Sequence, residues 1–305
     1  MTTNNINTIL FYNPDSGHSK SEHDLKIINN HFADRQIPLE TILVPKPADE
    51  LKAIVDKAIS DGVELFIAAG GDGTVSMIST HLVGTNIPIG IIPLGTGNVL
   101  AKALQLPLQL EQALDLFTGN DHKTFNVDTF KMGDRFFVLN VSVGVSPEIM
   151  KSVGSSDKQR LGFFAYLINF IQQLLGVKLY RISIDCDHDK STHYASEILI
   201  TNVATAGIEP LSWSEDISLT DGYLDLLIFR AKSFKDILGL LISVFTKQGK
   251  SNPVINFFQV KDYCRIDSTT TLKTQADGDI VGETPFEIKV FPSSLAVIVD
   301  KNLNL

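Results

Sequence analysis

The stretch LFIAAGGDGTVSMIST, residues 65–80, predicts a strand, a glycine-rich turn and a helix in succession. An apolar run typical of a buried strand leads directly into Gly-Gly-Asp-Gly-Thr (70–74), and apolar residues then recur with helical spacing. Glycines at such a turn let the backbone come close to a bulky group, and phosphate is the commonest one. An acid beside phosphate, here Asp72, indicates Mg²⁺. The stretch therefore predicts a phosphate-binding turn.

The bulk composition favours a folded protein of two domains. The chain has 305 residues, of which 44% are hydrophobic and 20% charged. A net charge of −9 argues against nucleic-acid binding, because no basic excess neutralises phosphates. The N-terminus lacks the basic and apolar regions of a signal peptide. Cys186 and Cys264 lie far apart without His neighbours, so we expect neither a disulfide framework nor a zinc site, and a reducing cytoplasm fits.

Strand patterns alternate with helical patterns in the first part of the chain. This alternation predicts a parallel sheet with helices on its faces. Three glycine-rich turns each follow a predicted strand and precede a predicted helix, so we expect all three at the carboxyl edge of the sheet, where ligands bind. The predicted strands are 8–12, 39–44, 65–69 and 87–93, and the turns are NPDSG (13–17), GGDGT (70–74) and GTGN (95–98).

The pattern changes near residue 124, and β-type runs dominate from there. We predict an α/β plus β fold: a parallel-sheet α/β nucleotide-binding domain at 1–130, completed by 293–305, and an antiparallel β-sandwich domain at 131–292. The β-type runs are 137–143, 179–186, 197–203, 223–229, 254–260 and 286–291. Trp213 either lines a lipid cleft in this domain or packs on its core.

A single glycine-rich turn is more often a plain connection than a binding site. Three at one edge favour a phosphate site, to which Thr74 and Thr96 would add hydroxyl donors. The chain has no G-x-x-x-x-G-K-[ST], no G-x-G-x-x-G after its first strand and no protein-kinase motifs. P-loop, Rossmann and protein-kinase sites are therefore not supported.

The combination of GGDGTV with an upstream NPDSG, a downstream LGTGN and a late DGDIVGETP resembles the diacylglycerol kinase catalytic-domain family. That family includes bacterial soluble lipid kinases, sphingosine kinases and ceramide kinases. The resemblance covers nearly the whole chain. GGDGT alone is shared with NAD kinases, whereas the combination with DGDIVGETP is specific.

The resemblance implies ATP and Mg²⁺ as cofactors and assigns residues to each. The metal and its water network would use Asp72 and Asp128, and a structural Mg²⁺ site would use Ser218, Asp221 and the carbonyl of Tyr223. Many bacterial members of the family have an Asp after the Asn of GTGN, where this chain has Val99. The implied nucleotide contacts are Asn13, Ser16, Gly17, Gly70, Gly71, Asp72, Gly73, Thr74, Val75, Ser76 and Thr96.

Transfer to an alcohol needs a group that accepts the hydroxyl proton. In the family this group ends an Asp-Gly-Glu motif, and the matching residue here is Asp279, one methylene shorter than Glu. We interpret Asp279 as the general base and Asp277 as the residue that organises the loop, both in the catalytic set with Asp72. Asp277 and Glu283 are close enough in the sequence to be rivals for the base, and a solvated acidic hairpin is the alternative for all three acids of this segment.

A lipid alcohol resides in a bilayer, so the enzyme would dock there as a peripheral protein of the cytoplasm. Residues 151–181 and 230–250 each carry a basic excess of about four charges around an apolar segment, which suits an anionic surface. We expect 161–177 to contact the membrane and 237–245 to pack on the β domain. The expected partner is the membrane lipid, with no nucleic acid; a homodimer is left open.

These features together predict an ATP- and Mg²⁺-dependent lipid kinase that phosphorylates diacylglycerol or a related lipid alcohol. One alternative is an NAD kinase-like enzyme with a soluble acceptor, motivated by GGDGT. Another is a non-catalytic nucleotide- or lipid-binding protein, motivated by Val99 and by Asp279 in place of Glu.

Overall fold

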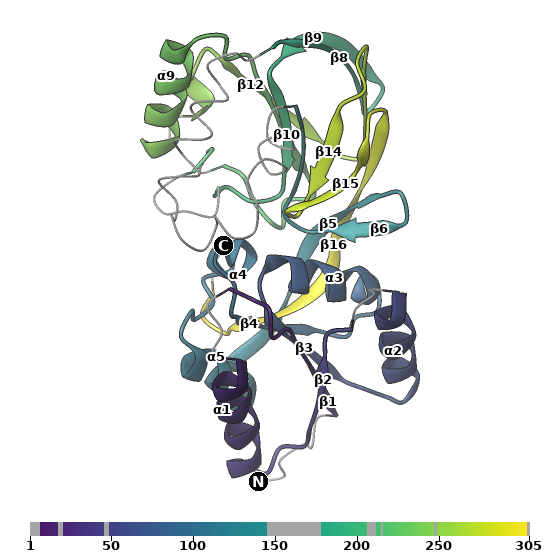
Figure 1. The fold of residues 1–305 in the computed structure, drawn as a ribbon, viewed down its shortest axis with the longest axis vertical. Coiled ribbons are helices and arrows are strands. Elements are labelled where there is room, and N and C mark those ends of the chain that lie inside the picture. The colour runs from purple at the N-terminus through teal and green to yellow at the C-terminus, as the bar shows by residue number, and fades with distance from the viewer. Residues whose placement is uncertain are drawn as a thin grey trace. The chain divides into compact units, whose positions relative to one another are not determined.

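The structure is a computed structural model and describes residues 7–17, 21–45, 49–144, 178–205, 212–214, 216–246 and 249–303. The predicted membrane contact at 161–177 lies outside the described residues. The chain divides into two compact units (Figure 1). The N-terminal unit comprises Met1–Thr129, Arg135–Val138 and Pro292–Leu305, and the C-terminal unit comprises Phe130–Asp134 and Leu139–Phe291.

The N-terminal unit has a parallel sheet with the strand order β2-β1-β3-β4, and the end of β16 joins it beside β4 through the pair Val297 and Ile89. Helices alternate with these strands along the chain. The elements are β1 (Thr8–Tyr12), α1 (Ser21–Asp34), β2 (Leu39–Leu43), α2 (Asp49–Ser60), β3 (Leu65–Gly70), α3 (Asp72–Leu82), β4 (Ile89–Pro93), α4 (Val99–Ala103) and α5 (Leu110–Thr118).

Burial explains why these segments form this sheet. Every residue of β1, β3 and β4 is buried, as expected for strands covered on both faces, whereas β2 at the edge is only partly buried. The helices bury one stripe each; in α3 it contains Val75, Ile78 and Leu82. Carboxyl ends of β1, β3 and β4 therefore meet at one edge, where the glycine-rich turns leave the sheet.

The C-terminal unit is antiparallel. One sheet has the order β12-β11-β10-β7-β14-β15, and another set of strands runs from the first part of β16 through β13 and β8 to β9. The predicted fold class, α/β followed by antiparallel β, is confirmed. The elements are β7 (Asn140–Gly144), β8 (Tyr180–Cys186), β9 (Asp189–Ala195), β10 (Glu197–Thr201), β11 (Leu224–Phe229), α9 (Phe234–Phe245), η1 (Gly249–Ser251), β12 (Ile255–Val260), β13 (Tyr263–Ser268), β14 (Lys273–Ala276) and β15 (Asp279–Glu283).

Two long strands carry the chain from one unit into the other: β5 (His122–Met132) and β16 (Phe286–Asp300), with the short β6 (Arg135–Phe137) paired to β5. The predicted domain boundaries at 130/131 and 292/293 fall within β5 and β16. Among the helices that the structure describes, none has the length and apolar character needed to cross a membrane.

The helix α9 packs on the first sheet of the C-terminal unit. Its Leu240 and Val244 join a buried cluster with Leu227 and Phe229 of β11, and Trp213 packs against the same cluster. The rings of Trp213 and Phe229 meet edge to face, with 5.5 Å between their centroids. Of the two interpretations of Trp213, the structure therefore supports packing on the core.

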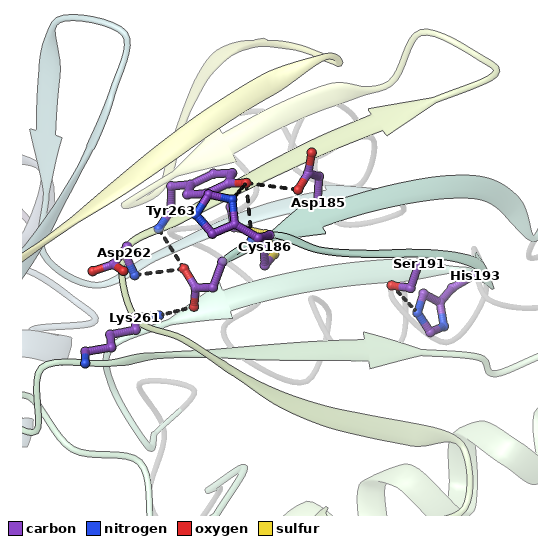
Figure 2. The surroundings of a disulfide bond; sticks show 10 residues. Asp185, Cys186, Ser191, His193, Lys261, Asp262 and Tyr263 are labelled. Atoms are coloured by element: carbon purple, nitrogen blue, oxygen red, sulfur yellow. Dashed lines mark hydrogen bonds between the residues drawn. A yellow bond between two sulfur atoms is a disulfide. The ribbon is translucent and has the colours of Figure 1, made fainter.

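The prediction that the cysteines form no disulfide is wrong. Cys186 on β8 and Cys264 on β13 lie directly opposite each other in the antiparallel pairing, with their Cα atoms 4.0 Å apart, and a disulfide joins them (Figure 2). They are 78 residues apart in the sequence, and only the pairing of β8 with β13 brings them together. Sequence distance is a poor guide here, because sheet pairing is non-local.

Candidate functional site

The three glycine-rich turns of the N-terminal unit are in direct contact. The turn after β1 reaches the turn after β3 through two side chains: Asn13 donates to Oγ1 of Thr74 over 2.8 Å, and Oγ of Ser16 accepts from the amide of Gly71 over 3.3 Å. The amide of Asn13 also donates to the carbonyl of Ala69 on β3. Asn13 and Thr74 lie 61 residues apart in the sequence, and Ser16 and Gly71 lie 55 residues apart.

Glycine is required where the turns touch. A Cβ on Gly95 would lie 2.5 Å from Cα of Gly71, and a Cβ on Gly17 would lie 2.5 Å from the carbonyl oxygen of Leu94. Gly17 also has φ of +54°, a conformation that other residues rarely adopt. The expectation that the three turns meet at one edge of the sheet therefore agrees with the geometry of this unit.

Asn98 shapes the third turn from within. It adopts the left-handed conformation, with φ of 47°, at the residue before α4. Its Oδ1 accepts from the amide of Gly95, and its Nδ2 donates to the carbonyls of Gly95 and Pro93. Sequence reasoning noticed Asn98 only as part of GTGN. An Asn next to glycines is the one signal that could have identified it, because Asn tolerates this conformation.

Asp72 links the second and third turns. Its Oδ1 accepts from the amide of Leu100 at 3.3 Å, and Val99 contributes a second backbone hydrogen bond. Burial raises the pKa of the Asp72 carboxyl above its usual value, and these backbone bonds oppose the rise. A buried carboxylate that is costly to ionise is a group that a bound cation would stabilise.

The predicted nucleotide contacts differ in accessibility. Gly73 is exposed, and a Cβ there would meet no atom within 4 Å, so the backbone is open to a ligand. The amides of Thr74 and Val75 instead donate to the carbonyl of Gly71. The buried members of the set are Ser16, Gly70, Thr74, Val75 and Ser76, the half-buried ones are Asn13, Gly71 and Asp72, and the exposed ones are Gly17, Gly73 and Thr96.

Asp128, predicted as the second metal residue, is fully buried on β5. Its Oδ1 accepts from the amide of Ser293 at 2.7 Å, which ties β5 to β16. In the described parts of the chain, no three His, Cys, Asp or Glu side chains gather in a metal-holding arrangement. The pairing of Asp72 with Asp128 around one ion therefore stays a prediction.

In the C-terminal unit, the predicted acceptor segment is a hairpin between β14 and β15. Asp277 and Gly278, with φ of 45° and 94°, form its two-residue turn, as Asp-Gly pairs do. Asp277 is 7% exposed, and its Oδ1 accepts from the amides of Leu139 and Asn140 at 3.0 Å each. Asp279 opens β15 as an exposed residue, and Glu283 ends the same strand.

Two buried polar atoms that sequence reasoning missed lie beside this hairpin. Ser142 on β7 pairs with Gln275 on β14, and within the described chain neither Oγ of Ser142 nor Oε1 of Gln275 has a hydrogen-bond partner. Gln275 lies two residues before Asp277. Buried polar atoms without partners are costly, so this pair is a local cost to the stability of the fold beside the hairpin. No sequence motif distinguishes these residues.

The predicted structural metal loop, residues 217–225, contains Asp221 and Asp225, and Asp216 directly precedes it. Ser218 accepts from the amide of Thr220, and Asp221 accepts from the amide of Tyr223 over 3.0 Å. Asp225 is 3% exposed, and burial together with nearby Asp221 raises its pKa to about 6. The excess of negative charge fits a cation, and Lys250, paired with Asp216 over 2.7 Å, supplies only part of the compensation.

Both parts of the chain match known family models. Residues 7–131 match the diacylglycerol kinase catalytic domain, and residues 140–299 match the YegS C-terminal NAD kinase beta sandwich-like domain. An uncharacterized protein of Synechocystis sp. is 33% identical over 301 residues, covering 94% of this chain and 69% of that protein. The chain belongs to the diacylglycerol kinase catalytic-domain family.

Other members of the diacylglycerol kinase family match over nearly the full length. A diacylglycerol kinase of Staphylococcus epidermidis is 27% identical, with 96% of this chain and 92% of that protein aligned. The crystal structure of a diacylglycerol kinase from Bacillus anthracis matches with a TM-score of 0.78 and 21% identity over 97% of each chain, a likeness of fold.

Proposed function

We propose that this protein is an ATP- and Mg²⁺-dependent lipid kinase that phosphorylates the hydroxyl group of diacylglycerol or a related lipid alcohol. The observation that carries the proposal is the contact among the three glycine-rich turns, which leaves Gly73 open at the start of α3. Amide groups at the start of a helix of this length favour an anion, and the triphosphate of ATP is the anion that a kinase binds.

On the nucleotide side, the exposed turn residues Gly17, Gly73 and Thr96 bind the phosphates. Asn13 and Ser16 orient the turns and do not need to reach the ligand. Asp72, with Asp128 in the family's pattern, would hold Mg²⁺. When bound, the ion neutralises phosphate charge; the loop with Ser218, Asp221 and Tyr223 would hold a second, structural ion.

On the acceptor side, Asp279 accepts the proton of the lipid hydroxyl. The hydroxyl oxygen forms a bond to the γ-phosphorus as the bond between that phosphorus and the bridging oxygen of ADP breaks. The proton moves to the Asp279 carboxylate, and the products are ADP and a phosphorylated lipid. Asp277 acts through the hairpin, because its carboxylate is engaged in holding the amides of Leu139 and Asn140.

The test is incubation of the pure protein with γ-labelled ATP, Mg²⁺ and a panel of lipid alcohols together with NAD. Label in a lipid, lost with EDTA and in Asp72→Ala and Asp279→Ala, supports the proposal. Asp61→Ala serves as a matched control, because Asp61 is an exposed acid that pairs with Lys57 on α2. Binding of ATP without transfer to any acceptor contradicts the kinase and supports a nucleotide-binding protein.

A second candidate is a kinase with a soluble acceptor of the NAD type. The observation in its favour is the match of residues 140–299 to an NAD kinase beta sandwich-like domain. Label in NAD and in no lipid alcohol would support it over the lipid kinase.

A further inference from the structure

The helix α9 has an apolar face that stays exposed in the described chain. Leu238, Ile242 and Phe245 are 47%, 56% and 61% exposed. Their spacing of four and then three residues places them on one side of a helix, within an arc of about 60° at about 100° per residue. We call these three residues, Leu238, Ile242 and Phe245, the outer face of α9.

The inner face of α9 already accounts for its packing. Leu240 and Val244, which lie on the opposite side, are 9% and 5% exposed and belong to the cluster on β10, β11 and β12. The helix also has its own start signal, a capping box between Ser233 and Asp236. Folding of the unit therefore does not explain three large apolar side chains on the outer face.

Large apolar residues that gather on one exposed face indicate an interaction site. In Figure 1, α9 lies at the outer side of the C-terminal unit, away from β14 and β15 of the same unit.

Charge around the outer face is positive. Lys235 precedes Leu238 by three residues, which puts it at the end of the same stripe, and it is exposed. Arg230 and Lys232 are exposed just before the helix. The one acid of this segment, Asp236, accepts from the amides of Lys232 and Ser233 in the helix cap. The N-terminal end of α9 is therefore positively charged next to the apolar outer face, although the whole chain has a net charge of −9.

We propose that the outer face of α9 docks on an anionic lipid surface, with the helix lying in the plane of the interface. This inference rests on the proposed function, because the lipid acceptor of such a kinase is located in a membrane surface. A helix of 12 residues is about 18 Å long. Its apolar side enters the boundary of headgroups and acyl chains, and Lys232 and Lys235 meet the anionic headgroups.

The size of the face favours lipid over a protein partner. A stable protein interface buries about 800 Å² on each partner. Three side chains on one narrow stripe provide much less than that, whereas shallow insertion into a bilayer needs only a few large apolar residues and adjacent basic charge.

The experiment measures sedimentation of the full chain with vesicles of phosphatidylcholine mixed with phosphatidylglycerol. The variant Leu238→Ser/Ile242→Ser/Phe245→Ser is expected to lower the vesicle-bound fraction at least tenfold at equal lipid. The matched control is Leu43→Ser/Leu108→Ser, because those residues are 58% and 50% exposed apolar residues of the other unit. The control is expected to bind as the wild type does. Circular dichroism verifies that all variants are folded.

A charge variant separates the two contributions. Lys232→Gln/Lys235→Gln is expected to weaken binding severalfold at low salt and to change little at high salt, because screening removes the same attraction. Its control is Lys52→Gln/Lys57→Gln, two exposed lysines of α2 that pair with Asp56 and Asp61.

Three results would overturn the inference. The wild type could fail to bind vesicles, the serine variant could bind as well as the wild type, or light scattering could show a dimer that only the serine variant loses while vesicle binding stays equal. In the last case the outer face joins two copies of the chain.

Phosphoryl transfer to a short-chain, water-dispersed diacylglycerol distinguishes this inference from the proposed function. A serine variant that keeps this transfer but loses vesicle binding supports both. A wild type that binds vesicles through α9 but phosphorylates no lipid supports the docking face and contradicts the lipid kinase.

Discussion

The side-chain amide of Asn13 donates a 2.8 Å hydrogen bond to Oγ1 of Thr74, which lies 61 residues further along the chain. Thr74 is 3% exposed, so the bond is shielded from water on the side of the hydroxyl. Two turns that leave neighbouring strands are thereby held as one surface. The shape of the proposed phosphate site depends on this link and on the glycines around it, more than on any single group that would touch the nucleotide.

Breaking this link should produce a measurable coupling. In a double-mutant cycle with Asn13→Ala and Thr74→Val, we expect a coupling of about 1 kcal/mol in the free energy of unfolding, from urea denaturation. The control cycle uses Asn29→Ala and Thr41→Val, whose side chains share a 3.1 Å hydrogen bond on the surface. That coupling should be near zero. Equal coupling in both cycles would contradict a special role for Asn13.

The two glycines Gly95 and Gly73 should respond differently to alanine. A Cβ on Gly95 would meet Cα of Gly71 at 2.5 Å, whereas a Cβ on Gly73 meets nothing within 4 Å. We expect Gly95→Ala to lower the free energy of unfolding by about 1–3 kcal/mol, as overpacking does.

For Gly73→Ala we expect a change in stability within about 0.5 kcal/mol but a weaker affinity for ATP, because the methyl group would occupy the space that phosphate approaches. Calorimetric titration and urea denaturation of each variant separate the two effects. If Gly73→Ala binds ATP as tightly as the wild type, the phosphates do not lie over Gly73.

Much of the N-terminal unit could be predicted because its signals are local. The strands β1, β3 and β4 are short apolar runs, and each is followed within a few residues by its own turn or helix signal. The helix after β3 is visible from the change of apolar spacing, but α3 begins at Asp72, inside the turn predicted at 70–74. The sequence predicted that the three turns lie close together, but not which residues form hydrogen bonds between them, because that depends on the direction of each side chain.

The C-terminal unit was harder to predict because its contacts join distant segments. The strand β9 is mostly exposed and polar, so it carries no apolar alternation and was missed. The predicted strand at 286–291 ended before Pro292-Ser293-Ser294, yet β16 continues to Asp300, since Asp128 accepts from the amide of Ser293 and Thr129 bonds to Ser294. Pro292 is a residue that normally ends a strand, but here side chains of β5 bond to the two residues that follow it in β16.

Alanine substitutions at Asp277 and Asp279 should have different effects, the first mainly on stability and the second mainly on catalysis. Asp277→Ala leaves the amides of Leu139 and Asn140 without their acceptor, so we expect a loss of about 2 kcal/mol or more in the free energy of unfolding. Asp279→Ala should change stability within about 0.5 kcal/mol and lower kcat at least about 100-fold. Asp279→Glu, which restores the family's residue, should retain activity. If Asp279→Ala is fully active, Asp279 is not the general base and another group accepts the proton.

Asp187 provides a prediction for pH. Burial acts to raise the pKa of its carboxyl, but hydrogen bonds from the amides of Lys261, Tyr263 and Asp262 outweigh burial and hold the pKa below its usual value. A carboxyl with a lowered pKa stabilises the fold above its unfolded pKa of about 3.9 and loses that contribution as pH falls through the folded value.

Asp187→Asn should therefore lower the free energy of unfolding at pH 7, by about 0.5–1 kcal/mol because solvent screens a partly exposed group, and the difference from the wild type should shrink below about pH 4. Urea denaturation over this pH range measures it. Asp189→Asn, at an exposed residue of the same hairpin, is the control for the loss of one surface charge. If the difference in the free energy of unfolding is the same at every pH, the substitution acts through altered packing or hydrogen-bond geometry and not through the lost charge.

Val99 is the position where the proposed metal site can be strengthened. Val99 begins α4, and its amide bonds to the Asp72 carboxylate; one of its methyl carbons and Oδ2 of Asp72 both lie against Gly97. Val99→Asp would place a second carboxylate beside the first. Without Mg²⁺, the two like charges repel and should lower the melting temperature in EDTA. With Mg²⁺, that repulsion becomes attraction to the ion, so the Mg²⁺ concentration for half-maximal activity should fall severalfold.

Val99→Asn, which has the same size and shape as the Asp variant but no charge, should leave both the melting temperature in EDTA and the Mg²⁺ requirement close to those of the wild type. The comparison of the two variants isolates charge from the loss of the apolar side chain. If Val99→Asp is destabilised equally with and without Mg²⁺ and its Mg²⁺ requirement is unchanged, then Asp72 does not hold the ion, and its buried carboxylate serves only to join the second turn to the third.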